Sequence, residues 1–295
     1  MRAPPGVLEP APRSWLFVPG NSRRYIAKAA ECDADALLLD LEDGVPPADK
    51  AMARAIIAEY LAEPSQRIRF VRVNALHTEM LQHDLDAVVQ HNLDGICLPK
   101  VDTASDVRLL ADHLTELERA RGLPAGATRV LAAIETARGL LGAPYIAAAD
   151  SRVVGLLFGA EDFALDLGLV ANRTDEAAHL TYARSMIVVA AVAAGRQAVD
   201  GVYPHLKDDA GLQADTRRSR DLGFSGKSAF SPRQLPTIHA IFHPAAAEIE
   251  FSRRVIAAFE TAAAESAAST VVDGQLVDLP IVLRARRVLE RSGLA

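Results

Sequence analysis

Hydrophobic positions follow two periods along the chain, one typical of buried strands and one typical of amphipathic helices. Short apolar runs predict strands at residues 15–18, 36–39, 68–73, 95–98, 130–134, 153–158, 198–203 and 223–230. Between them, apolar residues recur at helical spacing, as at residues 103–121. Strands that are apolar on both faces are typical of a parallel sheet covered by helices. About eight such strand–helix units predict an α/β fold of the TIM (β/α)8 barrel type.

Two segments lie outside this predicted barrel. Residues 1–12 are rich in Pro and small side chains, which predicts a disordered tail. Residues 13–243 form the predicted barrel and catalytic domain. Residues 244–295 carry two more helical patterns, at 245–268 and 279–292, joined by residues 271–278. We expect this C-terminal helical extension to pack on a neighbouring protomer or to cover a site.

The composition and net charge of the chain limit which kinds of binding partner we expect. The chain has 295 residues, half of them hydrophobic, and a formal net charge of -6, which argues against a nucleic-acid or anionic-membrane surface and favours a small-molecule partner. The two cysteines, Cys32 and Cys97, show no metal-ligand spacing, so we expect free thiols in a reducing compartment. No apolar run suggests a signal peptide or a membrane span. We expect a soluble, cytoplasmic protein.

Charged side chains follow the predicted strands at their carboxyl ends, where the loops of a parallel barrel converge on one mouth. These side chains are Asp40, Glu42, Arg72, Lys100, Glu135 and Asp162. Each one alone could be a helix cap or a solvated ion pair. Together they predict one polar site.

Two of these carboxylates suggest a metal site. Glu135 and Asp162 follow neighbouring predicted strands, so their side chains could share one hard cation. Oxygen ligands without nearby His or Cys favour Mg²⁺ or Mn²⁺ over zinc. Arg72 could then hold a carboxylate or an enolate oxygen with its bidentate fork.

Seven motifs, in order along the chain, resemble the citrate lyase β-subunit family. They are RSWLFVPG at 13–20, LDLED at 39–43, VRVN at 71–74, LPK at 98–100, AIE at 133–135, GAED at 159–162 and GFSGK at 223–227. The resemblance extends from about residue 13 to the C-terminus.

The resemblance implies a TIM barrel, typically a homotrimer, that cleaves carbon–carbon bonds in citryl, malyl or citramalyl thioesters. It implies Mg²⁺ on Glu135 and Asp162, with Arg72 and Glu135 at the substrate. In related acyl-CoA lyases, an aspartate in a C-terminal Asp-Gly-x-x-x-Asp pattern reaches the site of the neighbouring protomer, and Asp278 has that position here.

One motif departs from many members of the family, which have His-Pro after the Gly-Lys strand. This chain has Ser231-Pro232, as in the citrate lyase β-subunit branch. The departure leaves open whether the substrate is an acyl-CoA or an acyl-carrier-protein thioester.

The expected reaction is a retro-Claisen cleavage, in which two developing charges need stabilisation. Arg72 would hold an oxyanion, while Asp40 and Glu42, together with Asp43, would orient Arg72 or metal-bound water. Asp278 is the candidate that exchanges a proton with the acetyl enolate.

The phosphates of a pantetheine carrier need donors, and the helix start after Pro19 is a candidate site for them. Arg23 and Lys28 lie in its first turns. Arg24 lies beside them, and ordinary surface charge is an equal alternative for the two arginines.

Two other functions remain open from the sequence. A Schiff-base aldolase would use Lys100 as nucleophile, with a pKa lowered inside an apolar barrel. A non-catalytic, thioester-binding subunit of a larger lyase complex is the other alternative, because a barrel fold does not guarantee catalysis.

Overall fold

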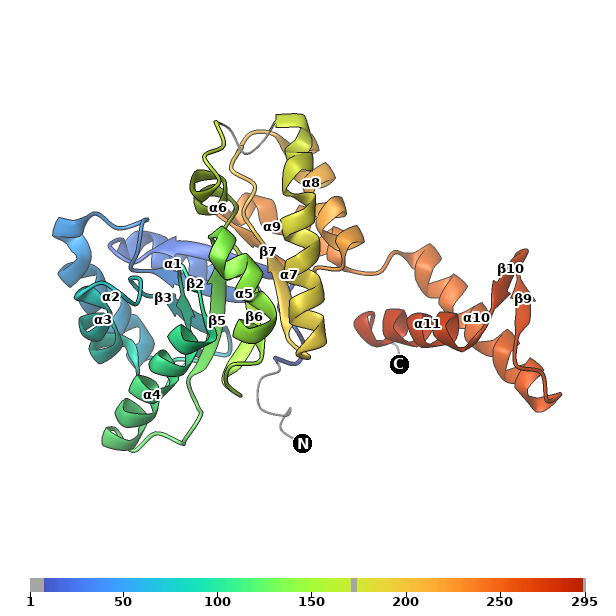
Figure 1. Cartoon of the computed structure of the whole chain (residues 1–295), viewed down its shortest axis with the longest axis horizontal. Coiled ribbons are helices and arrows are strands. Elements are labelled where there is room, and N and C mark those ends of the chain that lie inside the picture. The colour runs from blue at the N-terminus through green and yellow to red at the C-terminus, as the bar shows by residue number, and fades with distance from the viewer. Residues whose placement is uncertain (1–7, 171–173, 294–295) are drawn as a thin grey trace. The chain divides into compact units, whose positions relative to one another are not determined.

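Eight parallel strands close into a barrel in which each strand pairs with its neighbour in sequence and the last pairs with the first. The strands are β1 (Ser14–Pro19), β2 (Ala36–Asp40), β3 (Ile68–Arg72), β4 (Gly95–Leu98), β5 (Arg129–Ile134), β6 (Val153–Phe158), β7 (Gln197–Asp200) and β8 (Gly226–Ala229). The computed structural model describes residues 8–170 and 174–293 (Figure 1). The predicted TIM barrel is confirmed.

Helices follow the strands and cover the outside of the barrel (Figure 1). They are α1 (Arg23–Glu31), α2 (Lys50–Ala62), α3 (Met80–Val88), α4 (Ala104–Ala120), α5 (Ala137–Ala147), α6 (Ala160–Asp166), α7 (Thr181–Ala193) and α8 (Asp209–Leu222), with short 3-10 segments η1 (Pro47–Asp49), η2 (Thr174–Leu180) and η3 (Pro232–Gln234). Ser22 caps α1 by accepting a hydrogen bond from the Tyr25 amide. No helix in the described part of the chain is long and apolar enough to cross a membrane.

Alternate residues of the strands form one hydrophobic cluster inside the barrel. Trp15 of β1 packs edge-on against Phe70 of β3, with ring centroids 5.1 Å apart. Because side chains alternate along a strand, the last residues of β2 and β3, Asp40 and Arg72, lie on the same inward face as this cluster, and so does Glu135 just after β5. The strand period therefore directs these polar groups into the barrel mouth.

Two predicted strands are shorter than expected. Strand β7 ends at Asp200 rather than at residue 203, and β8 begins at Gly226 rather than at residue 223. Gly223 instead caps the end of α8 with φ +102°, a left-handed conformation in which glycine is favoured. On α2, Ala53 is buried, whereas the neighbouring Met52 is exposed.

The chain divides into two units, Met1–Ile238, here called the barrel unit, and His239–Ala295, here called the C-terminal unit. Helix α9 (Leu235–Phe242) includes the division point. Of the predicted tail, residues 1–7 lie outside the described residues, whereas Leu8 and Pro12 are buried. The Pro12 carbonyl accepts a hydrogen bond of 2.7 Å from Gln197 on β7.

The C-terminal unit contains α10 (Ala246–Ala264), α11 (Leu279–Arg291) and a hairpin between them, β9 (Thr270–Val272) with β10 (Gln275–Val277) (Figure 1). The two helices are as predicted, but the hairpin was missed. Its turn, Asp273-Gly274, has φ of +51° and +79°, and Asp-Gly between short apolar runs is a sequence signal for such a turn. Val255, Val272 and Val277 belong to the core of this unit.

Candidate active site

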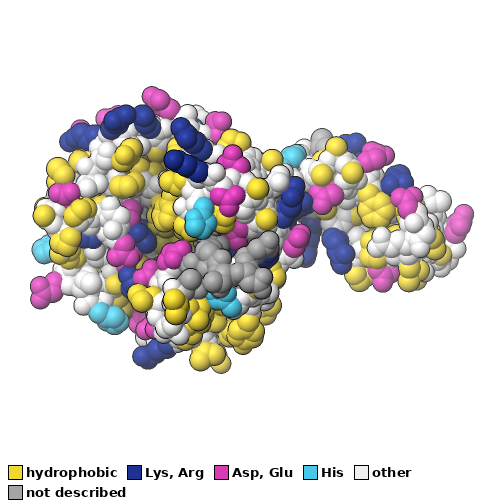
Figure 2. All heavy atoms as spheres, turned by 90° about the horizontal axis from the view of Figure 1, so that it is seen from above, with side chains coloured by type: hydrophobic (Ala, Val, Ile, Leu, Met, Phe, Trp, Pro, Cys, Tyr) yellow, Lys and Arg dark blue, Asp and Glu magenta, His cyan; other side chains and the backbone are white. Residues whose placement is uncertain are grey.

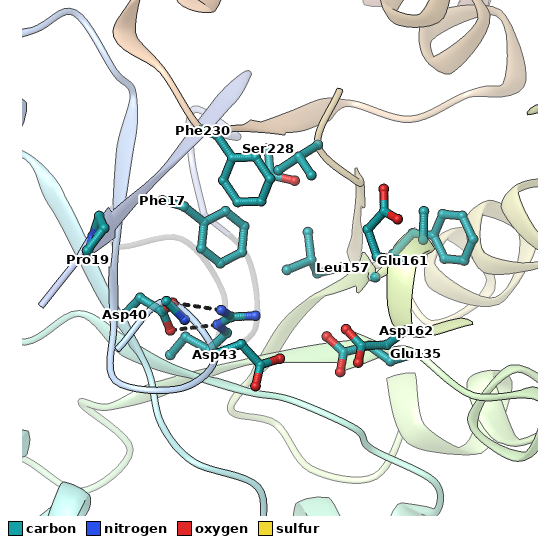
Figure 3. Close-up of a pocket in the computed structure, with 16 residues that line it drawn as sticks. Phe17, Pro19, Asp40, Asp43, Glu135, Leu157, Glu161, Asp162, Ser228 and Phe230 are labelled. Carbon is teal, nitrogen blue, oxygen red and sulfur yellow. Dashed lines mark hydrogen bonds and ion pairs between the residues drawn. The ribbon is translucent and has the colours of Figure 1, made fainter. Parts of the chain in front are cut away.

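A cavity of about 500 Å³ opens at the carboxyl ends of the barrel strands. Figure 3 shows an apolar side formed by Phe17, Leu157 and Phe230, and an acidic side where Glu135 and Asp162 lie next to each other. In the space-filling view, acidic and basic side chains gather beside an apolar hollow in the barrel unit (Figure 2). The sequence-predicted residues that line the cavity are Pro19, Asp40, Asp43, Arg72, Glu135 and Asp162.

Arg72 is held by two carboxylates and a ring. Its Nε and Nη2 donate to the two oxygens of Asp40 at 2.8 and 2.7 Å, and its Nη1 lies 3.0 Å from Glu42 Oε2. The Phe17 ring centroid is 4.8 Å from the guanidinium carbon. Burial lowers the pKa of Arg72, but the hydrogen bond and charge of Asp40 raise it by more. The guanidinium is therefore a fixed, permanent positive charge in the cavity wall.

Glu135 is 3% exposed and close to other acids. Burial, followed by repulsion from Glu42, raises the pKa of Glu135 to about 8. Its Oε2 accepts a hydrogen bond of 3.0 Å from the backbone amide of Lys100, a residue in the left-handed region at φ +52°. Strained backbone of this kind is common at functional sites.

The Lys100 ammonium bridges several acids of the site. It lies 2.6 Å from Glu42, 3.5 Å from Asp43 and 3.8 Å from Asp162. Burial lowers the pKa of Lys100, but the hydrogen bond and charge of Glu42 outweigh it, and the pKa is well above its usual range. The prediction of a lowered pKa for Lys100, which a Schiff-base nucleophile needs, is therefore wrong. The reason is that the loop after β2 places Glu42 next to this lysine.

Glu135 and Asp162 follow adjacent paired strands, β5 and β6, so a hard cation fits between them by charge and ligand type. The raised pKa of Glu135 reflects excess negative charge that a divalent cation would neutralise. The described residues contain no group of three or more His, Cys, Asp or Glu side chains arranged for a metal ion. Two carboxylates still suit Mg²⁺, which keeps several waters and often takes its remaining ligands from the substrate.

A second cavity of about 470 Å³ shares Phe17, Pro19 and Phe230 with the first. Lys28 lines it from α1 and Arg233 lines it from η3. Arg23 lies at the surface instead, where it forms an ion pair with Glu59. Of the residues predicted to hold a carrier, the structure therefore brings Pro19 and Lys28 together and places Arg23 in an ion pair.

Asp278 belongs to the C-terminal unit, where it precedes α11. Its Oδ1 atom is buried and has no hydrogen-bond partner among the described residues. Its role in the active site stays a prediction.

Lys227, part of a sequence motif without an assigned role, is a residue of β8 whose side chain pairs with Asp215 of α8 and does not line the cavity. It is fully buried, donates to the Gly201 carbonyl, and pairs with Asp200 and Asp215 at 2.9 and 2.7 Å. Arg184 of α7 pairs with the same two aspartates. Burial raises the pKa of Asp200, but Lys227 and Arg184 lower it by more, so it stays ionised. This cluster joins β7 and β8 to the helices.

Sequence reasoning missed two polar residues of the cavity, Glu161 and Ser228 (Figure 3). Glu161 stands beside Asp162 in the GAED motif, so its position after β6 could have drawn attention to it. Ser228 lies in the middle of a short strand, and only the inward face of β8 places it at the cavity.

Comparison with known proteins shows similarity over nearly the whole chain. A family model described as HpcH/HpaI aldolase/citrate lyase matches residues 13–232. Citrate lyase subunit beta of Escherichia coli K12 is 40% identical over 285 residues, covering 96% of this chain and 94% of that protein. A (3S)-malyl-CoA thioesterase of Cereibacter sphaeroides ATCC 17029 is 38% identical over 282 residues, covering 95% and 94%.

Solved structures show the same similarity. Protein CitE from Mycobacterium tuberculosis, in complex with magnesium, acetoacetate and coenzyme A, is 34% identical and superposes with a TM-score of 0.83, covering 97% of this chain and 100% of that one. A citrate lyase beta subunit from the same organism, complexed with oxaloacetate and magnesium, is 35% identical with a TM-score of 0.68, covering 79% of this chain and 98% of that one.

Proposed function

Since the chain belongs to the HpcH/HpaI aldolase/citrate lyase family and is a lyase, we propose that it cleaves the carbon–carbon bond of a β-hydroxyacyl thioester in a Mg²⁺-dependent reaction. The candidate substrates are citryl, citramalyl and malyl thioesters, and the products are a 2-keto acid and an acetyl thioester. The observation that carries the proposal is the meeting of Arg72 with the Glu135–Asp162 carboxylate pair in one cavity.

Glu135 and Asp162 are the residues that would hold the metal ion. When bound, Mg²⁺ supplies a Lewis acid that stabilises the ionised hydroxyl and carboxylate of the substrate. The two carboxylates bring the charge that this ion needs, and Lys100 fixes one of them through its backbone amide.

Cleavage moves electrons away from the substrate hydroxyl. Its proton passes to solvent, the oxygen becomes the keto group, the carbon–carbon bond opens, and the bonding pair goes to the acetyl thioester as an enolate. Arg72 faces the cavity with donors left over after it binds Asp40 and Glu42, because a guanidinium has five. We assign these donors to the developing oxyanion, with Asp40 and Glu42 orienting the fork.

The enolate carbon must then take up a proton. We assign this step to Asp278 of a neighbouring protomer, in a homotrimer. The buried and unpartnered Oδ1 of Asp278 supports this assignment, since a buried polar atom without a partner calls for one in the assembly.

The second cavity offers space for the carrier of the thioester. Lys28 and Arg233 bring positive charge to it, and Pro19 lies at its junction with the first cavity. We propose that a phosphorylated pantetheine carrier, from coenzyme A or an acyl carrier protein, lies here with its thioester directed toward Arg72.

The test is incubation of (S)-citramalyl-CoA, malyl-CoA and citryl-CoA with the enzyme, with Mg²⁺ or with EDTA, followed by product analysis. We expect a keto acid and acetyl-CoA with Mg²⁺, no cleavage with EDTA, and loss of activity in Glu135→Ala and Arg72→Ala. Turnover that resists EDTA would contradict the metal assignment.

Product analysis also separates carbon–carbon cleavage from hydrolysis. One group of relatives is described as (3S)-malyl-CoA thioesterases, and a thioesterase releases free coenzyme A and an intact hydroxy acid. If that pair of products appears and no acetyl-CoA is formed, hydrolysis replaces cleavage as the function. An enzyme inactive on every coenzyme A ester is next assayed with the acyl-carrier-protein thioesters.

A further inference from the structure

Lys50 is a buried cation for which the reaction described above has no use. It is the first residue of α2, and 8% of it is exposed. Its ammonium donates to the carbonyls of Leu41 and Glu42 at 2.6 and 2.7 Å, and to Asn74 Oδ1 at 2.8 Å. An ammonium has three donors, so every one of them is used, and two of the three bind backbone of the loop after β2.

Asp40 also holds this loop, through its backbone amides. Its Oδ1 accepts from the Glu42 amide and its Oδ2 from the Gly44 amide, both at 2.9 Å. A Cβ atom on Gly44 would come within 2.3 Å of Asp40 Oδ2, so glycine is required for this close approach. Asp40 therefore binds the amides of the loop while Lys50 binds its carbonyls.

The position of Lys50 is itself fixed by a buried network. Asn74 donates to the Leu41 carbonyl at 3.0 Å and to Asp84 at 2.6 Å, and Arg54 of α2 donates to the other oxygen of Asp84 at 2.7 Å. Charge-assisted hydrogen bonds of this kind are among the stronger ones in proteins. The Lys50 ammonium is therefore held in one position, from which it binds two carbonyls of the loop.

The loop carries the acid that faces the two cations of the site. Glu42 lies 3.0 Å from Arg72 and 2.6 Å from Lys100. Its backbone is bound at both ends of the residue, the amide by Asp40 and the carbonyl by Lys50. Its side-chain direction therefore depends on these two contacts.

We propose that Lys50 is a positioning residue for the lyase reaction, which holds the loop of residues 41–44 so that Glu42 orients Arg72 and Lys100. This inference rests on the proposed function for its catalytic consequence. Its structural part, the immobilisation of the loop, does not depend on which reaction the site performs.

The structural part is tested by amide hydrogen exchange of the peptide that covers residues 41–45. Replacing Lys50 with methionine removes three charge-assisted bonds, and we expect exchange in this peptide to become about tenfold faster or more. Arg69→Met is the matched control, because Arg69 is also a buried cation that binds backbone carbonyls, those of Tyr60, Glu63 and Asn92. We expect it to leave exchange in this peptide and the activity unchanged.

The catalytic part is tested by a double-mutant cycle on kcat with Lys50→Met and Glu42→Gln. We expect Lys50→Met to lower kcat about tenfold or more in the wild-type background, and by less than about twofold in the Glu42→Gln background. General destabilisation would act equally in both backgrounds. If the two substitutions lower kcat independently, so that their fold losses multiply in the double variant, Lys50 does not act through Glu42 and the proposal is overturned.

Two further results distinguish the possible failures. If Lys50→Met does not fold, Lys50→Gln, which keeps an amide donor, takes its place in both measurements. If the wild-type enzyme cleaves no thioester, the proposed function fails, and the exchange comparison still decides whether Lys50 holds the loop. Unchanged exchange in a folded Lys50 variant overturns the inference itself.

Discussion

The charge of Glu135 links metal binding to pH. Burial and Glu42 raise the pKa of this carboxyl to about 8, and a metal ion binds only the ionised form, so protons and Mg²⁺ compete. About 1% of the carboxyl is ionised at pH 6, about 10% at pH 7 and about 90% at pH 9. We therefore expect the Mg²⁺ association constant to rise about tenfold between pH 6 and 7 and to level off above pH 9.

The same group makes the metal-free protein less stable as pH rises. Between its ordinary pKa near 4.5 and its folded value of about 8, the folded state keeps a proton that the unfolded state has lost. The free energy of unfolding then falls by about 1.4 kcal/mol per pH unit across this window, and the loss is complete above it. Glu135→Gln removes the charge and keeps an acceptor for the Lys100 amide, so this variant is more stable than wild type by roughly 2–5 kcal/mol at pH 9.

Two assays check these values. Calorimetric titration with Mg²⁺ at pH 6, 7, 8 and 9 measures the affinity, and urea unfolding at pH 5 and 9 in EDTA measures stability. Glu116→Gln, at an exposed position of α4, is the control and should follow wild type in both assays. Mg²⁺ affinity that does not change between pH 6 and 8, together with no stabilisation of Glu135→Gln, would refute the reasoning.

Three more outcomes are expected. Arg72→Lys keeps the charge but loses the fork that binds Asp40, so kcat should fall about 10²- to 10³-fold; steady-state kinetics decide this, and a change confined to KM would contradict it. Lys227→Met removes one cation from Asp200 and Asp215, which should lower the free energy of unfolding in urea by about 3–5 kcal/mol; an unchanged midpoint would contradict it. Co-refolding inactive Arg72→Ala with inactive Asp278→Ala should restore activity at about a quarter of the sites in a shared-site oligomer; no recovery would place Asp278 outside the site.

The barrel was predictable because its strands are short apolar runs whose ends coincide with charged residues. The run before Asp40 is buried at every position, as a strand between a filled interior and a layer of helices must be. The convergence of Arg72, Glu135 and Asp162 was also predictable, because parallel strands bring their carboxyl ends together whatever the loops do.

The contacts between loops could not be predicted from local sequence. Whether Glu42 faces Lys100 depends on the path of one loop, and that contact raises the pKa of the lysine instead of lowering it. The buried roles of Lys50 and Lys227 likewise follow from elements far apart in sequence, since a lysine in a sequence gives no sign of burial until its partners are placed.

The sequence by itself determined the barrel, its family and the charged residues at its mouth, since these depend on the period of apolar positions and on short motifs. Only the tertiary structure decided which carboxylate holds Arg72, which acids share Lys100, and which lysines are buried. The physical reason is that hydrophobic periodicity is a local property, repeated over many residues. Ion pairing and desolvation, by contrast, depend on a few ångströms between groups that the fold alone brings together.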